Sequence, residues 1–191
     1  MLDETHGSRY QRCKPYMAGQ GLDAVVAISP ENVLYFAETY IQTQTSIRER
    51  LAIAVMPLES DPVMIACKIE APTVEHETWI ADRRYYVEHQ VSPIALLAEV
   101  LKEKHLENKR IGFELNYLMA SYYQELAALL PQAEFVPCHR IFDQAVSYTH
   151  LLTLLTSPRS ECNDRRAILW PKPRHGGRLE RHPAQTGRNR F

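Results

Sequence analysis

The stretch Gly21–Tyr40, GLDAVVAISPENVLYFAETY, decides how this chain folds. Its apolar part, Leu22–Ile28, is too short to cross a membrane and is flanked by turn-forming residues, so it predicts a strand buried on both faces. Such a strand needs helices on both sides of its sheet. Ser29 then predicts a helix cap, and Pro30 suits the first helical position, where an N–H has no intrahelical partner.

The segment before this stretch, Ser8–Gln20, predicts a helix. Four side chains lie near one face at spacings of three and four: Tyr10, Cys13, Tyr16 and Met17. Pro15 interrupts that pattern, because a proline inside a helix costs about 3 kcal/mol. We therefore expect a kink at Pro15 or a helix that begins there. Gly21 is expected to close the helix in a left-handed conformation.

The segment after it contains a predicted hairpin. Thr43–Arg50 is polar, shows no periodicity and is expected to be exposed. Two apolar runs, Leu51–Met56 and Val63–Cys67, follow and are joined by Pro57–Pro62, a turn rich in structure-breaking residues. Two such runs around a short polar turn predict paired strands.

The rest of the patterned chain alternates between helices and strands. Ser92-Pro93 repeats the cap-and-proline start, and Ile94–Lys104 is strongly amphipathic. Weaker patterns predict helices at Ala71–Ile80 and Leu118–Leu130, and strands at Tyr85–Val87, Ile111–Glu114 and Ala133–Val136. This order predicts an α/β fold with three layers, α/β/α, around a mixed sheet of five or six strands.

Composition excludes several classes of protein. The chain has 191 residues, 45% of them apolar, which suits one domain of ordinary size or one domain with an appendage. Its four cysteines are far apart and form no C-x-x-C pair, so neither a disulfide framework nor a zinc ribbon is predicted. The first ten residues lack the pattern of a signal peptide, and no apolar run approaches about 18 residues. We expect a cytoplasmic protein without a membrane partner.

The pattern of strands and helices stops at about Ala145, which divides the chain into a domain, 1–145, and a tail, 146–191, expected to be disordered. From Pro158 to Phe191 there are nine basic against three acidic residues, which leaves thirteen basic against twenty acidic residues before it. The tail is either a basic arm for nucleic acid or the product of a lost reading frame through truncation, frameshift or assembly error. Its arginines are scattered without clustering on any face, whereas nucleic-acid arms usually carry lysine-rich runs or arginines interleaved with glycine and aromatic residues. This favours the second interpretation and no nucleic-acid partner.

No motif in the chain predicts a metal or catalytic site. His76-Glu77 begins H-E-x-x-H, but Ile80 stands where the second histidine belongs. Cys138 and His139 are adjacent, so in an extended segment their side chains point to opposite faces. The carboxylates share no spacing that pairs them, and we interpret most of them as solvated charges: Glu31, Glu38, Glu70, Glu77 and Glu114.

Arg48 and Arg50 are the candidate substrate-binding residues. They alternate with Ile47, Glu49 and Leu51 just before the second strand, so both are placed to project to one side at its start. Two guanidinium groups there suit a substrate carboxylate, which they bind through paired, charge-assisted hydrogen bonds. The alternative is a solvated strand edge on which the two arginines have no ligand.

Three pieces in this order resemble the N-terminal domain of the creatinase/prolidase/aminopeptidase P family. The pieces are Gly21–Tyr40 with SPENVLYF, the hairpin LAIAVMPLESDPVMIA, and Lys109–Val136 with IGFELNYL, followed by IFDQA. The resemblance covers about Ser8 to Ala145. It implies an α/β/α domain that precedes a catalytic domain in which two aspartates, one histidine and two glutamates hold two divalent metal ions.

The resemblance also implies an accessory function. In such proteins the first domain assists homodimer formation and lends residues to the rim of a cleft that binds peptides, and the parent enzyme is expected to be an Xaa-Pro peptidase or related metallohydrolase. None of the metal ligands is assigned in this chain, which alone is expected to be inactive and to carry no cofactor. The alternative is a free-standing, non-catalytic binding or dimerisation module.

Overall fold

The structure is a computed structural model that describes residues 6–138 and Phe142. These residues all belong to the first of two units of the chain, Met1–Leu155. The predicted tail 146–191 and its boundary at Ala145 lie outside the described residues.

Helix α1, Ser8–Gly19, begins where the sequence predicted and runs through Pro15, so the alternative of a start at Pro15 is wrong. It ends in a Schellman motif, in which the Leu22 N–H donates to the Met17 carbonyl at 2.9 Å and the Gly21 N–H to the Ala18 carbonyl at 3.0 Å. Gly21 has φ 65°, the left-handed conformation predicted for it. Tyr16, which was expected on the buried face, is 41% exposed.

The strand, turn and helix predicted from Gly21–Tyr40 are confirmed. Strand β1, Ala24–Ala27, is buried at every position. Helix α2, Pro30–Ala37, begins with proline, and the Ser29 hydroxyl accepts a hydrogen bond from the Asn32 N–H at 3.3 Å. The cap places the helix directly at the end of the strand.

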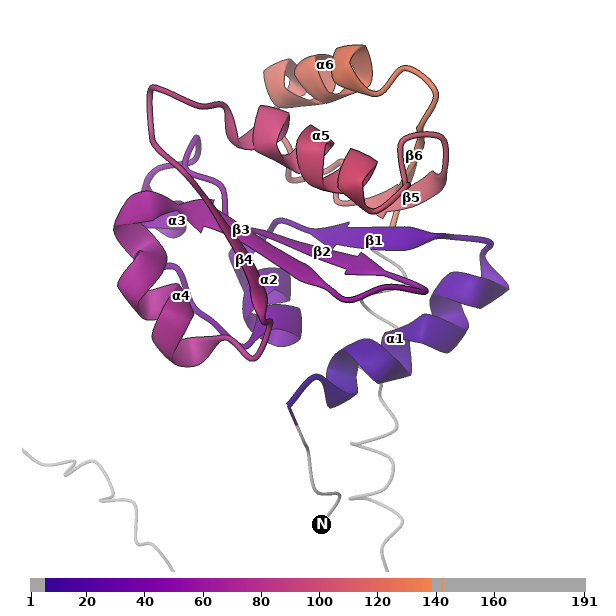
Figure 1. The fold of residues 1–191 in the computed structure, drawn as a ribbon, viewed down its shortest axis with the longest axis horizontal. Helices are drawn as coiled ribbons and strands as arrows, with labels where there is room; N and C mark the ends of the chain where they lie inside the picture. Colours follow the sequence, from indigo (N-terminus) through magenta and orange to yellow (C-terminus); the bar gives the residue numbers. More distant parts are fainter. Residues whose placement is uncertain (1–5, 139–141, 143–191) are drawn as a thin grey trace, which may run out of the picture. The chain divides into compact units, whose positions relative to one another are not determined.

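The remaining elements complete a mixed sheet of six strands, which confirms the predicted mixed sheet, and the strand order is β4-β3-β2-β1-β5-β6 (Figure 1). Their bounds are α3 Gln42–Ser46, β2 Ile53–Pro57, β3 Val63–Cys67, the 3-10 turn η1 Lys68–Glu70, α4 Ala71–Glu77, β4 Asp82–Tyr86, α5 Pro93–Glu103, β5 Arg110–Phe113, α6 Ala120–Leu129 and β6 Glu134–Pro137. Only β2 runs antiparallel to its neighbours β1 and β3. Within the described part of the chain no helix is long and apolar enough to span a membrane.

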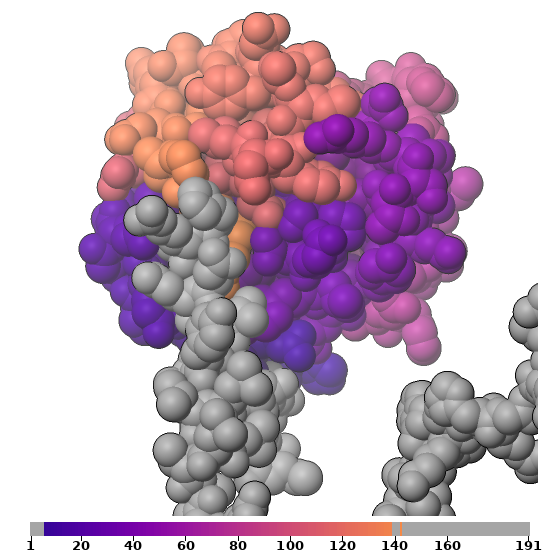
Figure 2. Space-filling model, turned by 180° about the vertical axis from the view of Figure 1, so that it is seen from behind, coloured from indigo at the N-terminus to yellow at the C-terminus, as the bar shows by residue number. Residues whose placement is uncertain are grey.

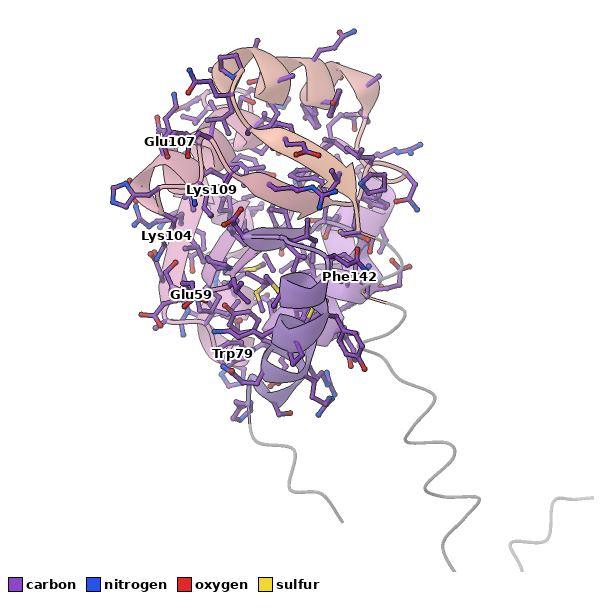
Figure 3. All side chains as sticks on the ribbon, turned by 90° about the vertical axis from the view of Figure 1, so that its right-hand side faces the viewer. Glu59, Trp79, Lys104, Glu107, Lys109 and Phe142 are labelled. Carbon is purple, nitrogen blue, oxygen red and sulfur yellow. The ribbon has the colours of Figure 1, made fainter. Side chains whose placement is uncertain are left out.

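Helices cover both faces of the sheet, which confirms the three layers. Figure 1 shows α5 and α6 on one face and α1, α2 and α4 on the other. Alternate residues of β1 serve the two cores: Val25 packs with α1 and α2, and Val26 packs with α5. Figure 3 shows Trp79 and Phe142 on the α1 side of the sheet. Phe142 belongs to the same core as Val25, and Trp79 packs against that core.

Three predicted segments differ from the structure. The strand predicted at Tyr85–Val87 is β4, which begins earlier and ends before Val87. Thr43–Arg50 was expected to be an exposed connection, but it contains α3, and Gln44 is only 1% exposed. The Gln44 amide donates to the carbonyls of Ile28 and Ala52, so it links the end of β1 to the start of β2 inside the core. Helix α4 ends at Glu77 and not at Ile80, because the backbone becomes extended at Thr78; the Trp79 ring N–H donates to the Phe36 carbonyl at 2.8 Å.

Candidate functional site at the carboxyl edge of the sheet

The topology brings six chain segments to one edge of the sheet. Strands β1, β3, β4, β5 and β6 run in the same direction, and β2 runs against them. The ends of these five strands therefore lie at the same edge as the start of β2, and Arg48 and Arg50 precede β2 there. We call this the carboxyl edge, and ligands of open α/β sheets bind at such edges.

Glu114, which follows β5, is the most buried carboxylate of this edge, with 4% of its surface exposed. Its carboxylate accepts hydrogen bonds from the N–H groups of Ile28 and Ser29, the Ser29 hydroxyl and the Asn32 side-chain amide. The chain turns to opposite faces after β1 and after β5, so Glu114 fills the crevice at the switch point of the sheet. Glu114 is therefore an exception to the interpretation of most of these carboxylates as solvated charges.

Arg50 is held by two carboxylates of its own chain. Its side chain is 12% exposed, and it donates through Nε to one oxygen of Glu88 at 3.3 Å and through Nη2 to the other at 2.5 Å. Glu70 lies 4.0 Å from Nη1 and accepts a hydrogen bond from the Thr43 hydroxyl. The hydrogen bond with Arg50 lowers the pKa of Glu88, and the same bond raises the pKa of Arg50. Arg50 thereby ties the start of β2 to the ends of β3 and β4.

Arg48 lies in a different environment. Residues 47–50 form a turn closed by the Arg50 N–H and the Ile47 carbonyl at 3.0 Å, so they are not the extended strand end that the alternation indicated. Arg48 is exposed on this turn, and its charge acts on Tyr117. Burial and then Glu31 raise the pKa of Tyr117, whereas Arg48 lowers it. The structure therefore separates the two arginines: one is enclosed and paired, and the other faces outward.

The turn of residues 47–50 also contacts the opposite layer of the domain. The Tyr122 hydroxyl on α6 donates to the Glu49 carbonyl at 3.0 Å. Figure 2 shows the violet segment around this turn against the salmon segment that leads into α6. Several apolar side chains are exposed around the same edge, Ile69 most of all at 68%: Ile47, Ile69, Val87 and Val91.

The described residues do not fit a pair of metal ions. None of them forms a group of three or more His, Cys, Asp or Glu side chains arranged to hold a metal. His76 is exposed at the end of α4, and Glu77 accepts hydrogen bonds from the Thr39 hydroxyl at 3.0 Å and the Tyr40 N–H at 3.1 Å. Burial raises the pKa of the Cys138 thiol, which keeps it protonated, while His139 lies outside the described residues.

Known proteins were compared with this chain at the level of sequence and of structure. The family description "Creatinase/Prolidase N-terminal domain" matches residues 9–145. No functionally curated protein matched the sequence. Among solved structures, the N-terminal domain of an Xaa-Pro dipeptidase from Lactobacillus brevis has a TM-score of 0.61 at 19% identity, over 71% of this chain and 98% of that one.

Two further structures agree with this match. A proline dipeptidase from Streptococcus pneumoniae has a TM-score of 0.60 at 19% identity, over 71% of this chain and 94% of that one. A dipeptidase from Pyrococcus horikoshii has a TM-score of 0.59 at 22% identity, over 71% of this chain but only 35% of that one. These likenesses show a shared fold. With the match over residues 9–145, the chain belongs to the Creatinase/Prolidase N-terminal domain family.

Proposed function

We propose that this chain is the accessory N-terminal domain of an Xaa-Pro peptidase or creatinase-type metallohydrolase. In this proposal the domain assists homodimer formation and forms part of the substrate cleft, and a catalytic domain outside this sequence holds two divalent metal ions. The family match over residues 9–145 is the observation that carries the proposal. The chain spans 35% of the Pyrococcus dipeptidase it resembles, which suits one domain of a larger enzyme. A cytoplasmic location belongs to the same proposal.

Within this function the two arginines have different roles. Arg48 is the residue that meets a substrate carboxylate, because it is exposed and has no ion-pair partner among the described residues. Arg50 is a positioning residue, because Glu88 and Glu70 occupy its guanidinium group and fix the turn that carries Arg48. In this proposal both arginines serve substrate binding, but only Arg48 contacts the substrate carboxylate.

The gene itself supplies the first test of this function. DNA is sequenced through and beyond the codon for Ala145 and translated in every frame. We expect a continuation that carries two Asp, one His and two Glu at the spacing of a dinuclear metal site. A confirmed stop after Phe191 would overturn the peptidase function, and the chain would then be a non-catalytic binding or dimerisation module.

Kinetics of the full-length enzyme separate the two arginines. Arg48→Gln is expected to raise KM for Xaa-Pro dipeptides about tenfold, since one charge-assisted hydrogen bond is lost, and to leave the free energy of unfolding unchanged. Arg50→Gln is expected to lower stability as well, because it leaves Glu88 and Glu70 without their cation. An unchanged KM in Arg48→Gln would remove Arg48 from the substrate site.

A further inference from the structure

An open hollow of about 350 Å³ lies beside the end of β4, between the turn at Glu49, the start of α5 and α6. Four of its lining residues are apolar or aromatic, namely Tyr86, Val91, Pro93 and Tyr122, and the polar residues His89, Gln90 and Ser92 line it as well. Three carboxylates stand in the same lining: Glu49, Glu88 and Glu125. The hollow thus combines surface that packs against hydrocarbon with oxygen atoms that accept charged hydrogen bonds.

The three carboxylates are not equally neutralised. Glu88 is paired with Arg50 at 2.5 Å, whereas Glu49 and Glu125 have no ion pair with any described residue. Burial raises the pKa of Tyr122, and the charges of Glu49 and Glu125 raise it further. Two unneutralised negative charges therefore converge on the aromatic wall of the hollow, and they favour a cation beside it.

An arginine side chain matches this lining better than a compact cation. Its hydrocarbon stem packs against aromatic and aliphatic walls while the planar guanidinium binds carboxylates through two parallel hydrogen bonds. The chain already binds one guanidinium in this way, since Arg50 lies between Glu88 and Glu70 a short distance along the same edge. Val87 and Val91 are exposed beside the hollow and offer apolar contact to the rest of a partner surface.

We propose that this hollow is a docking site for an arginine side chain of a protein partner, held by Glu49 and Glu125 against Tyr122. The partner surface is apolar around the arginine, to match Val87 and Val91. The proposal is independent of the peptidase function, and its test reads binding and not catalysis, so the two fail separately.

The test uses the full 191-residue chain and two peptides. Amide resonances are followed by NMR at low salt during titration with acetyl-Leu-Arg-Leu-amide and with the same peptide carrying citrulline, which has the shape of arginine without its charge. We expect saturable shifts at Val91 and Tyr122 with the arginine peptide, and affinity about tenfold lower with citrulline, as loss of charge-assisted bonds implies. Equal binding of the citrulline peptide, or no saturable shift at these residues, overturns the proposal.

A matched pair of variants excludes general charge attraction. The double variant Glu49→Gln with Glu125→Gln removes the two unpaired carboxylates of the hollow. It is expected to lower the affinity for the arginine peptide about tenfold. Glu75→Gln with Glu99→Gln changes the net charge equally at exposed positions outside the hollow and is expected to leave binding unchanged. An equal loss in both double variants would show attraction to net charge alone and would overturn the proposal.

Discussion

Gly112 in β5 has no room for a side chain. A Cβ at this position would lie 2.8 Å from the Cβ of Cys138, 2.9 Å from Cδ1 of Leu22 and 3.0 Å from Cγ1 of Val25. All three of these neighbours are buried, so they have little freedom to retreat. Gly112→Ala is therefore expected to lower the free energy of unfolding by about 1–3 kcal/mol, measured by urea denaturation.

Gly19 provides the control for that substitution. A Cβ there meets no atom within 4 Å, and the residue ends helix α1 in a conformation open to alanine. Gly19→Ala is expected to leave stability unchanged or to raise it by up to about 1 kcal/mol. Equal stability of the two variants would show that the contacts of Gly112 relax freely.

Glu114→Gln tests the network at the switch point. All the hydrogen bonds that Glu114 makes to Ile28, Ser29 and Asn32 are accepted by its carboxylate, and an amide in its place turns a donor toward other donors. Since the site is buried, we expect a loss of about 3 kcal/mol in the free energy of unfolding. Exposed Glu99→Gln is the control, and a similar small effect in both would contradict the structural role of Glu114.

At the scale of elements, two helices begin with the same Ser-Pro pair and offer a direct comparison. Ser92 only caps α5, accepting from the N–H groups of Ile94 and Ala95, whereas Ser29 caps α2 and also donates to Glu114 at 2.8 Å. Ser92→Ala is expected to destabilise the protein by about 1 kcal/mol and Ser29→Ala by about 2 kcal/mol. Thermal or urea unfolding measures both, and a larger loss at Ser92 would contradict this order.

Those two helix starts also show why so much of the fold was predictable. Each is encoded within a few residues by a capping serine, a proline and an apolar run, so backbone chemistry alone decides it. Gly21 likewise acts on its immediate neighbours. The prediction that Thr43–Arg50 is an exposed connection was wrong for the opposite reason. Gln44 is polar, and it is buried because its partners are carbonyls beside two strands that only the folded sheet brings to it.

The site was predicted less well than the fold for the same physical reason. Glu114 and Ser29 are 85 residues apart, and Arg50 and Glu88 are 38 apart. Their meeting depends on which strands are neighbours, and periodicity carries no information on strand order. The only local signal was that Glu114 directly follows an apolar strand, which places a carboxylate at the carboxyl edge. The substrate roles of Arg48 and Arg50 remain predictions.

For the whole molecule, carboxylates that pair with arginine make stability depend on pH. A hydrogen bond from Arg84 lowers the pKa of Asp82 below its ordinary 3.8, and one from Arg50 lowers the pKa of Glu88 below its ordinary 4.5. At pH values near and below these ordinary pKa values, both carboxyl groups bind fewer protons in the folded protein than in the unfolded chain. Their contribution is therefore present above the ordinary values and is lost as the pH falls through the folded-state values.

Denaturation at a series of pH values measures this dependence. We expect the free energy of unfolding to fall as the pH drops below the ordinary values of 4.5 and 3.8, and the slope to flatten in Asp82→Asn with Glu88→Gln. Glu99→Gln keeps the slope of the unsubstituted protein. An unchanged slope in the double variant would assign the acid sensitivity to other groups.

The position of β5 beside β1 also sets the order in which the sheet is completed. The pairs β1–β2 and β2–β3 join strands that follow each other in the sequence. The pair β1–β5 instead joins distant segments, since Ala24 pairs with Ile111. During synthesis Ala24 therefore leaves the ribosome long before Ile111. Contacts between distant segments require closure of a long loop and form late in folding. Glu114→Gln is thus expected to speed unfolding and to leave the folding rate nearly unchanged, which stopped-flow kinetics measures. A slowed folding rate would instead place this long-range junction in the folding nucleus.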